Sequence, residues 1–159
     1  MPRSAEISAG LLVYRRTGDL DVLLAHPGGP FWAKKDAGVW TIPKGLVETG
    51  DLLACARREF AEETGLTVAG PFVPLAPVTQ KSGKVVHAFA VAADLDLSDA
   101  HSNLFALEWP PRSGKIKRFP EVDRVAYFDI ETAMMKILAY QQPFIRELVE
   151  KLRQDDGTK

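Results

Sequence analysis

The chain has 159 residues, of which 46% are hydrophobic and 26% are charged, and its formal net charge is −1. This composition fits one soluble domain over residues 1–159, and the lack of a basic excess argues against general nucleic-acid binding. The single cysteine, Cys55, excludes an intramolecular disulfide. The sequence has no run of about eighteen apolar residues, so we expect neither a membrane span nor a membrane partner. We therefore expect a cytoplasmic protein that is a monomer or a homodimer.

The first half of the chain is predicted to contain strands, a loop and one clear helix. Strands are expected over residues 7–14 and 21–24, with a turn at residues 17–19 between them. Glycine and proline crowd residues 26–38, which predicts a loop, and a short apolar strand at residues 39–42 ends before Pro43. The helix spans residues 51–64, with Asp51 as its N-cap and Gly65 in the left-handed position after its end.

The second half adds strands and then helices. Strands are predicted at residues 71–79 and 85–93, with a polar turn between them, and a last strand at residues 125–128. Residues 95–117 are polar and interrupted by proline, which indicates a loop-rich segment. Helices are expected at residues 130–137 and 143–152, followed by a frayed tail at residues 154–159. This element order predicts an α/β fold with a mixed central sheet between helices.

Three glutamates share one face of the predicted helix at residues 51–64. Glu59, Glu62 and Glu63 stand at i, i+3 and i+4, and they border the apolar stripe instead of lying opposite it. Acidic residues on a helix usually form a solvated face. Like charges at this spacing, near the C-terminal end of the helix, are unfavourable, and a bound divalent cation would remove that penalty. The pattern leaves a solvated face and a metal site as two alternatives.

The segment from Gly45 to Leu66 resembles the Nudix box, which is a glycine, five residues, a glutamate, seven residues and then Arg-Glu-apolar-x-Glu-Glu-x-Gly-apolar. The lead-in Trp40-Thr-Ile-Pro43-Lys44-Gly45 also matches. The resemblance extends over roughly residues 7–152 and implies the Nudix α/β/α sandwich with a mixed sheet. The second half of the box matches at every fixed position, namely Arg58, Glu59, Phe60, Glu62, Glu63, Gly65 and Leu66.

The first half of the box departs from this pattern, because twelve residues separate Gly45 from Arg58, one fewer than in the family. Aligned from Gly45, Asp51 takes the place of the first glutamate and would pair with Arg58. Aligned from Arg58, Gly50 takes that place and Asp51 is free to cap the helix. We favour the second alignment, because the register of a helix is harder to shift than a loop.

The resemblance implies hydrolysis of a diphosphate bond in a nucleoside-diphosphate-linked small molecule, such as a nucleoside triphosphate or a dinucleoside polyphosphate. It further implies Mg²⁺, or Mn²⁺, bound by Glu59, Glu62, Glu63 and the carbonyl of Gly45, with one cation activating the attacking water. The alternative is a non-catalytic Nudix-like nucleotide-binding or regulatory module. Such modules usually lose glutamates of the box, whereas this chain keeps three.

Residues outside the box complete the predicted site. Family members often add a further carboxylate as ligand or base, and Glu121 is the candidate because it precedes the last predicted strand, with Glu108 as the alternative. Lys44 and the basic stretch that contains Arg112 and Lys115 are the candidates for binding substrate phosphates. For these residues, as for Phe31 or Trp32 stacking on a base, ordinary surface or packing positions remain the other interpretation.

Overall fold

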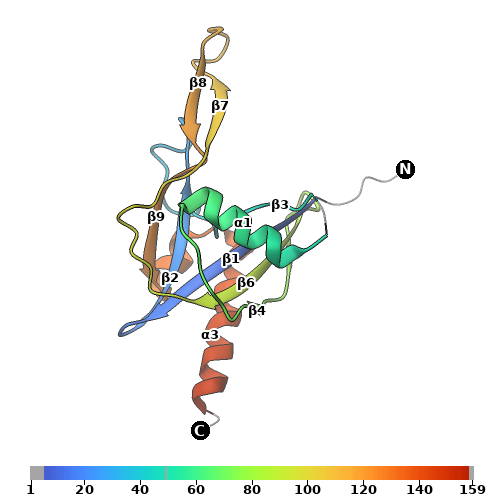
Figure 1. Ribbon diagram of the computed structural model, residues 1–159, viewed down its shortest axis with the longest axis vertical. Helices are drawn as coiled ribbons and strands as arrows, with labels where there is room; N and C mark the ends of the chain where they lie inside the picture. The colour runs from blue at the N-terminus through green and yellow to red at the C-terminus, as the bar shows by residue number, and fades with distance from the viewer. Residues whose placement is uncertain (1–5, 49, 158–159) are drawn as a thin grey trace, which may run out of the picture.

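A mixed seven-stranded sheet forms the centre of the computed structural model, which describes residues 6–48 and 50–157 (Figure 1). The main path runs through β4 (Val73–Pro74), β6 (Val85–Ala92), β1 (Ile7–Arg16), β2 (Leu20–Pro27) and β9 (Val122–Asp129). Strands β1 and β6 run parallel, and the other neighbouring pairs run antiparallel. Short strands β3 (Lys44–Leu46) and β5 (Val78–Thr79) pair with β1 and β6, respectively.

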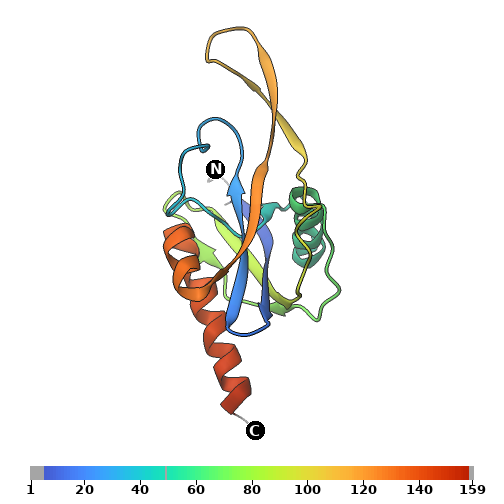
Figure 2. The ribbon, with the colours of Figure 1, turned by 90° about the vertical axis from the view of Figure 1, so that its left-hand side faces the viewer.

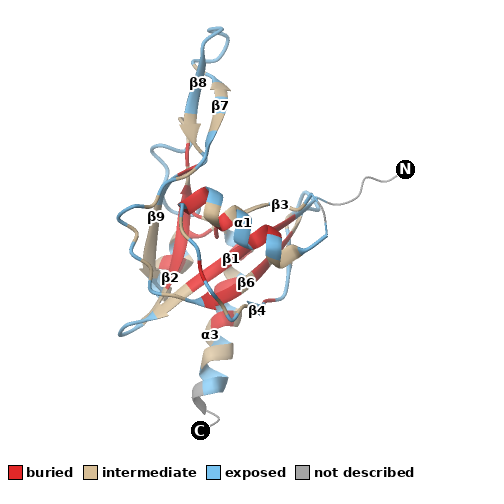
Figure 3. Ribbon diagram, viewed as in Figure 1, coloured by how far each residue is buried: buried red, intermediate tan, exposed pale blue. Residues whose placement is uncertain are grey.

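Helices cover both faces of this sheet (Figure 2). Helix α1 (Leu52–Thr64) packs on one face, and α2 (Ile130–Lys136) and α3 (Gln142–Gly157) pack on the other. The alternation of side chains along β1 supplies both cores, since Leu11 joins the α1 side while Leu12 joins the α3 side. Burial is concentrated in the central strands (Figure 3). The predicted α/β/α sandwich with a mixed sheet is confirmed.

Helix α1 begins and ends as its sequence predicts. The Asp51 side chain accepts hydrogen bonds from the backbone N–H groups of Leu53 and Ala54, at 3.0 and 3.2 Å. Gly65 has a left-handed φ of 73° and donates its N–H to the carbonyl of Ala61. These two caps fix the helix register, and that register decides which box residues face the sheet.

The predicted loop at residues 95–117 is wrong in part, because a two-stranded hairpin forms there. Strands β7 (Leu104–Glu108) and β8 (Ile116–Pro120) pair with each other and project from the body of the molecule (Figure 1). Most of their residues are exposed or half-buried, so no continuous apolar face marks them in the sequence. One ring contact, Phe105 with Phe119 at 6.1 Å between centroids, stabilises the pair from one side.

Smaller corrections have local causes. Residues 71–79 form two short strands instead of one, because Pro74 and Pro77 cannot donate to a ladder. Residues 39–42 contribute only isolated bridges, Trp40 to Ile137 and Thr41 to Ala25. Helix α3 continues to Gly157 where fraying was expected, and residues 158–159 lie outside the described part of the chain. No helix within the described residues is long and apolar enough to cross a membrane.

Candidate active site

Strand β3 and helix α1 meet at a position where only glycine fits. A side chain at Gly45 would overlap the carboxylate of Glu59, so the missing Cβ brings the β3 backbone against the helix. The Cys55 thiol contacts the carbonyl oxygens of Gly45 and Leu46 at 3.8 and 3.5 Å. Burial raises the pKa of that thiol, which keeps it protonated and makes it a packing residue of this junction.

Glu63 is a buried carboxyl group without a complete set of partners. The residue is 7% exposed, and its Oε2 atom has no hydrogen-bond partner. Burial, followed by the charge of Glu59, raises its pKa to about 9, although the charge of Lys44 and a backbone hydrogen bond from that residue oppose the shift. An uncompensated carboxyl group in this position favours either a proton or a cation.

Glu59 and Glu62 lie on either side of the Arg58 guanidinium. Arg58 Nη2 is 3.7 Å from Glu59 Oε1, and its Nε is 3.9 Å from Glu62 Oε1. Burial and then the Glu62 charge raise the pKa of Glu59, whose side chain is 16% exposed, whereas the Glu62 side chain is 43% exposed. Arg58 therefore forms ion pairs with two glutamates of the box.

Within the described residues, no three His, Cys, Asp or Glu side chains are already gathered as a metal-binding cluster. The predicted ligands Glu59, Glu62 and Glu63 lie in the same part of α1, and Arg58 pairs with the first two of them. Two features still fit a cation, namely the unpartnered Oε2 of Glu63 and the close approach of Gly45 to Glu59.

The backbone holds Glu121 next to this group. It lies in the connection between β8 and β9, and its charge raises the pKa of both Glu59 and Glu63. Asn103 ties the connection to the helix, because its N–H donates to the Glu62 carbonyl at 2.8 Å and its own carbonyl accepts from the Glu121 N–H at 2.9 Å. Glu108 lies at the outer end of β7, where its side chain accepts from the Arg112 N–H at 3.0 Å. This arrangement supports Glu121 over Glu108.

Comparison with known protein families identifies the domain. The family model of the NUDIX domain matches residues 5–152 of this chain. The chain belongs to the NUDIX family. A search of curated protein sequences finds no match for this NUDIX chain.

Solved structures share the NUDIX fold at low sequence identity. An Ap4A hydrolase from C. elegans, solved as a binary complex, is 22% identical with a TM-score of 0.62, over 92% of this chain and 98% of that chain. The NUDIX domain of Shewanella oneidensis NrtR, complexed with ADP ribose, is 16% identical with a TM-score of 0.64, over 97% of this chain and 90% of that chain. A mutT/nudix family protein from Listeria innocua is 15% identical with a TM-score of 0.66, over 99% and 100% of the two chains.

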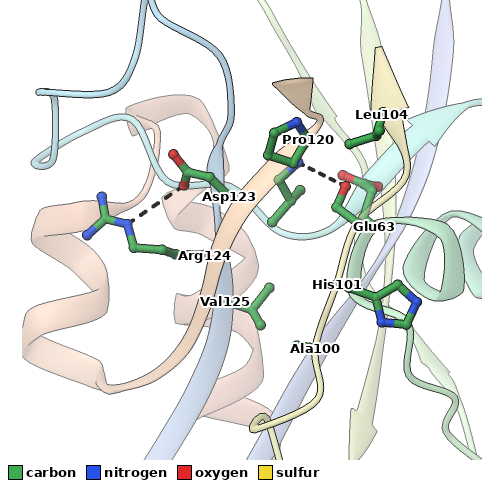
Figure 4. A pocket seen from close by; sticks show the side chains of 10 residues that line it. Glu63, Ala100, His101, Leu104, Pro120, Asp123, Arg124 and Val125 are labelled. Carbon is green, nitrogen blue, oxygen red and sulfur yellow. Dashed lines mark hydrogen bonds and ion pairs between the residues drawn. The ribbon is translucent and has the colours of Figure 1, made fainter. Parts of the chain in front are cut away.

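Two cavities border residues of the box in this NUDIX domain. One, of about 280 Å³, lies beside Glu63 and is lined by Leu104, Pro120, Asp123 and Arg124, with His101 at its edge (Figure 4). The other, of about 230 Å³, has Lys44 and Gly45 in its wall together with Lys84. Lys44 is thus the predicted phosphate-binding residue that the fold brings to the acids.

The other predicted contacts lie elsewhere. Arg112 and Lys115 lie in the turn of the projecting hairpin, about 13 Å along β7 from its base. The exposed Phe31 contacts Trp109 edge-on at 5.3 Å, and Lys35 lies over the ring of Trp32 at 5.1 Å. Phe31 therefore braces the loop against the hairpin, and neither contact identifies a site for a base.

His26 is a residue whose position the sequence did not predict. Its imidazole is fully buried and bridges two segments, with Nδ1 2.7 Å from Asp123 Oδ1 and Nε2 2.6 Å from the Lys35 carbonyl. These contacts fix the loop after β2 against the start of β9, next to the cavity at Glu63. No local sequence pattern predicts the contact between His26 and Asp123, because the two residues are far apart in the chain.

Proposed function

We propose that this chain hydrolyses a diphosphate bond in a nucleoside-diphosphate-linked small molecule with the help of Mg²⁺ or Mn²⁺. The observation that carries the proposal is the buried Glu63 carboxyl group, whose Oε2 has no hydrogen-bond partner and whose pKa is raised by burial and by the charges of Glu59 and Glu121. A protein retains such a group at a cost in stability unless a cation compensates it. The family of the chain supplies the reaction class, since Nudix proteins generally cleave diphosphates.

The proposed ligands are all oxygen atoms, which suits Mg²⁺ or Mn²⁺ better than zinc. They are the carboxylates of Glu59, Glu62 and Glu63 and the carbonyl of Gly45, which the absence of a Cβ brings against the helix. A bound cation neutralises charge on the diphosphate and makes a water molecule more acidic.

The remaining steps belong to the chain itself. Glu121, exposed to solvent and next to the buried acids, accepts a proton from the attacking water. Lys44 holds a substrate phosphate from the wall of the adjoining cavity. Arg58 orients Glu59 and Glu62 through its two ion pairs.

Two of the similar structures are consistent with this substrate class. One is an Ap4A hydrolase and another is bound to ADP ribose, so the fold accommodates small phosphorylated ligands in those proteins. A binding module without catalysis is the second candidate. Retention of the three glutamates in the second half of the box favours the enzyme, and turnover separates the two.

The test is a screen of nucleoside triphosphates, dinucleoside polyphosphates and nucleotide sugars with Mg²⁺ or Mn²⁺, using ¹⁸O-water to identify the phosphorus that is attacked. We expect hydrolysis that stops with EDTA and returns when metal is added. Glu63→Gln should lower kcat by at least about a hundredfold. Full activity in metal-free buffer would contradict the mechanism, and binding without turnover of any compound would favour the module.

A further inference from the structure

One face of the β7–β8 hairpin continues the surface of the cavity at Glu63. Leu104 and Pro120 form the first pair of this hairpin, and both line that cavity beside the Glu63 carboxyl group (Figure 4). Residues directly opposite in an antiparallel pair share a face, and every second residue returns to it. The next pair on the same face is Ala106 with Arg118.

Arg118 is therefore the member of the basic stretch closest to the acids on this face. It lies two residues from Pro120, about 7 Å along the strand. The small side chain of Ala106 opposite leaves the surface around it open. Lys117 pairs with Leu107 on the other face, and Arg112 and Lys115 lie farther out in the turn.

The guanidinium of Arg118 is available for a ligand. It is exposed and, within the described residues, has no hydrogen bond or ion pair. Glu108, the one carboxylate on the hairpin, is on the same face and accepts the Arg112 N–H. With four cations and one carboxylate, residues 104–120 have a net charge of +3, whereas the whole chain has −1. This local excess favours a polyanion.

The base of the hairpin is attached rigidly to the acidic site. Asn103, which precedes β7, bonds both to the Glu62 carbonyl at the end of α1 and to the N–H of Glu121 after β8. Gly28 packs so closely on the carbonyl of Pro120 that any side chain would overlap it, and its N–H donates to the Glu121 carbonyl at 2.9 Å. These contacts fix the base of the hairpin, two residues from Arg118, relative to the helix that carries Glu63.

We propose that Arg118 binds a substrate phosphate beyond the two that share the cleaved bond. Its guanidinium would grip that phosphate with two parallel N–H donors, while the half-exposed Leu104 contacts an apolar part of the substrate. This assignment rests on the proposed diphosphate hydrolysis, and it selects compounds with three or more consecutive phosphates over those with two. Nucleotide sugars and other diphosphates lack the third phosphate that Arg118 binds.

The test compares methylene-bridged, non-hydrolysable analogues of ATP and ADP by titration calorimetry on the full chain with Mg²⁺. The wild type should bind the ATP analogue more tightly. Arg118→Ala should weaken the ATP analogue by about tenfold to hundredfold and the ADP analogue far less. Arg118→Lys should restore only part of the loss, because lysine lacks the planar fork. On hydrolysed triphosphates, KM should rise while kcat stays close to that of the wild type.

Lys117→Ala is the matched control, because it removes the same charge from the next position but from the opposite face. It should leave the preference for the ATP analogue intact. If Lys117→Ala lost as much affinity for the ATP analogue as Arg118→Ala, Arg118 would act only through long-range attraction. If Arg118→Ala lost equal affinity for both analogues, Arg118 would not distinguish a third phosphate. Both results overturn the assignment, as does a wild type that binds neither analogue.

The same measurements separate this assignment from the proposed hydrolysis. A wild type that shows the Arg118-dependent preference but hydrolyses nothing would leave the phosphate site standing and reject the enzyme. If the wild type hydrolyses diphosphates while Arg118→Ala changes neither binding nor KM, the proposed hydrolysis stands and the phosphate site at Arg118 is rejected. Since Arg118 is exposed and has no partner among the described residues, the melting temperature of its variants should stay unchanged.

Discussion

Replacing Glu63 with glutamine should stabilise the metal-free protein more as the pH rises. The pKa of the Glu63 carboxyl group is about 9 in the folded chain, mainly because it is buried, against an ordinary value of 4.5. Between these values the folded protein keeps its proton while the unfolded chain releases it. Unfolding therefore releases a proton in this window, and raising the pH favours the unfolded wild type. Glu63→Gln removes that proton release.

The size of the effect follows from the width of the window. Each pH unit between 4.5 and 9 should cost the wild type about 1.4 kcal/mol of unfolding free energy relative to Glu63→Gln. From pH 4.5 to pH 7.5 the difference amounts to about 4 kcal/mol. The glutamine amide also has to find partners near the place where Oε2 had none, which costs about 1–3 kcal/mol at every pH. The prediction therefore concerns how the difference in unfolding free energy between the two proteins changes with pH, not its value at any one pH.

The assay is urea unfolding in EDTA at several pH values between 5 and 8.5, applied to the wild type, Glu63→Gln and Glu62→Gln. Glu62 is the control, because it neighbours Glu63 on the same helix but its side chain is 43% exposed. Its variant should follow the wild type far more closely. A difference between wild type and Glu63→Gln that does not change with pH would refute the reasoning. So would a wild type that gains stability relative to the variant as pH rises.

Two further outcomes follow from the same site. Adding Mg²⁺ to EDTA-treated protein should raise the melting temperature of the wild type. At a free Mg²⁺ concentration of a hundred times Kd, the gain in unfolding free energy should be about 2.7 kcal/mol, and Glu63→Gln should gain much less. Glu121→Gln should lower kcat with little effect on substrate binding, whereas Glu108→Gln should leave kcat unchanged because its side chain contacts the hairpin turn. A larger loss of kcat in Glu108→Gln would reverse this assignment.

The parts of the fold that the sequence predicts well are those with local causes. The caps of α1, its apolar stripe and the placement of Glu59 and Glu63 at the border of that stripe all depend on residues within a few positions of each other. Burial of Glu63 and half-burial of Glu59 follow from that register. The sequence could not predict that Glu63 would lack a partner, because this depends on what other segments bring to it.

The hairpin shows where pattern reading fails. None of its strand residues is fully buried, and the residues of β7 on both faces are mostly apolar, so its sequence lacks the alternation of apolar and polar residues that a half-buried strand displays. Choosing Arg112 and Lys115 as phosphate ligands followed from the density of basic residues in that stretch. Pairing register, which no single-chain pattern supplies, instead puts Arg118 on the face that reaches the acids.

The one-residue shortening of the box has a definite structural consequence. Asp51 Oδ1 caps α1 through Leu53 and Ala54, and Arg58 is paired with Glu59 and Glu62. The prediction that Asp51 caps the helix is therefore confirmed. Because seven residues of helix span about 10 Å, the capping geometry keeps Asp51 away from Arg58.

Asp51→Ala should then cost about 0.5–2 kcal/mol of unfolding free energy and leave kcat nearly unchanged. Asp51→Asn and Asp51→Ser should recover most of the loss, since both side chains accept the same hydrogen bonds from the first turn. Urea unfolding of the single variants and of Asp51→Ala with Arg58→Ala measures the coupling between the two positions. Their effects should add, because among the described residues the Asp51 side chain bonds only to the backbone of Leu53 and Ala54, which the Arg58 side chain does not contact. A coupling above about 1 kcal/mol, or a failure of asparagine and serine to restore stability, would mean that Asp51 works through Arg58 and not as a cap.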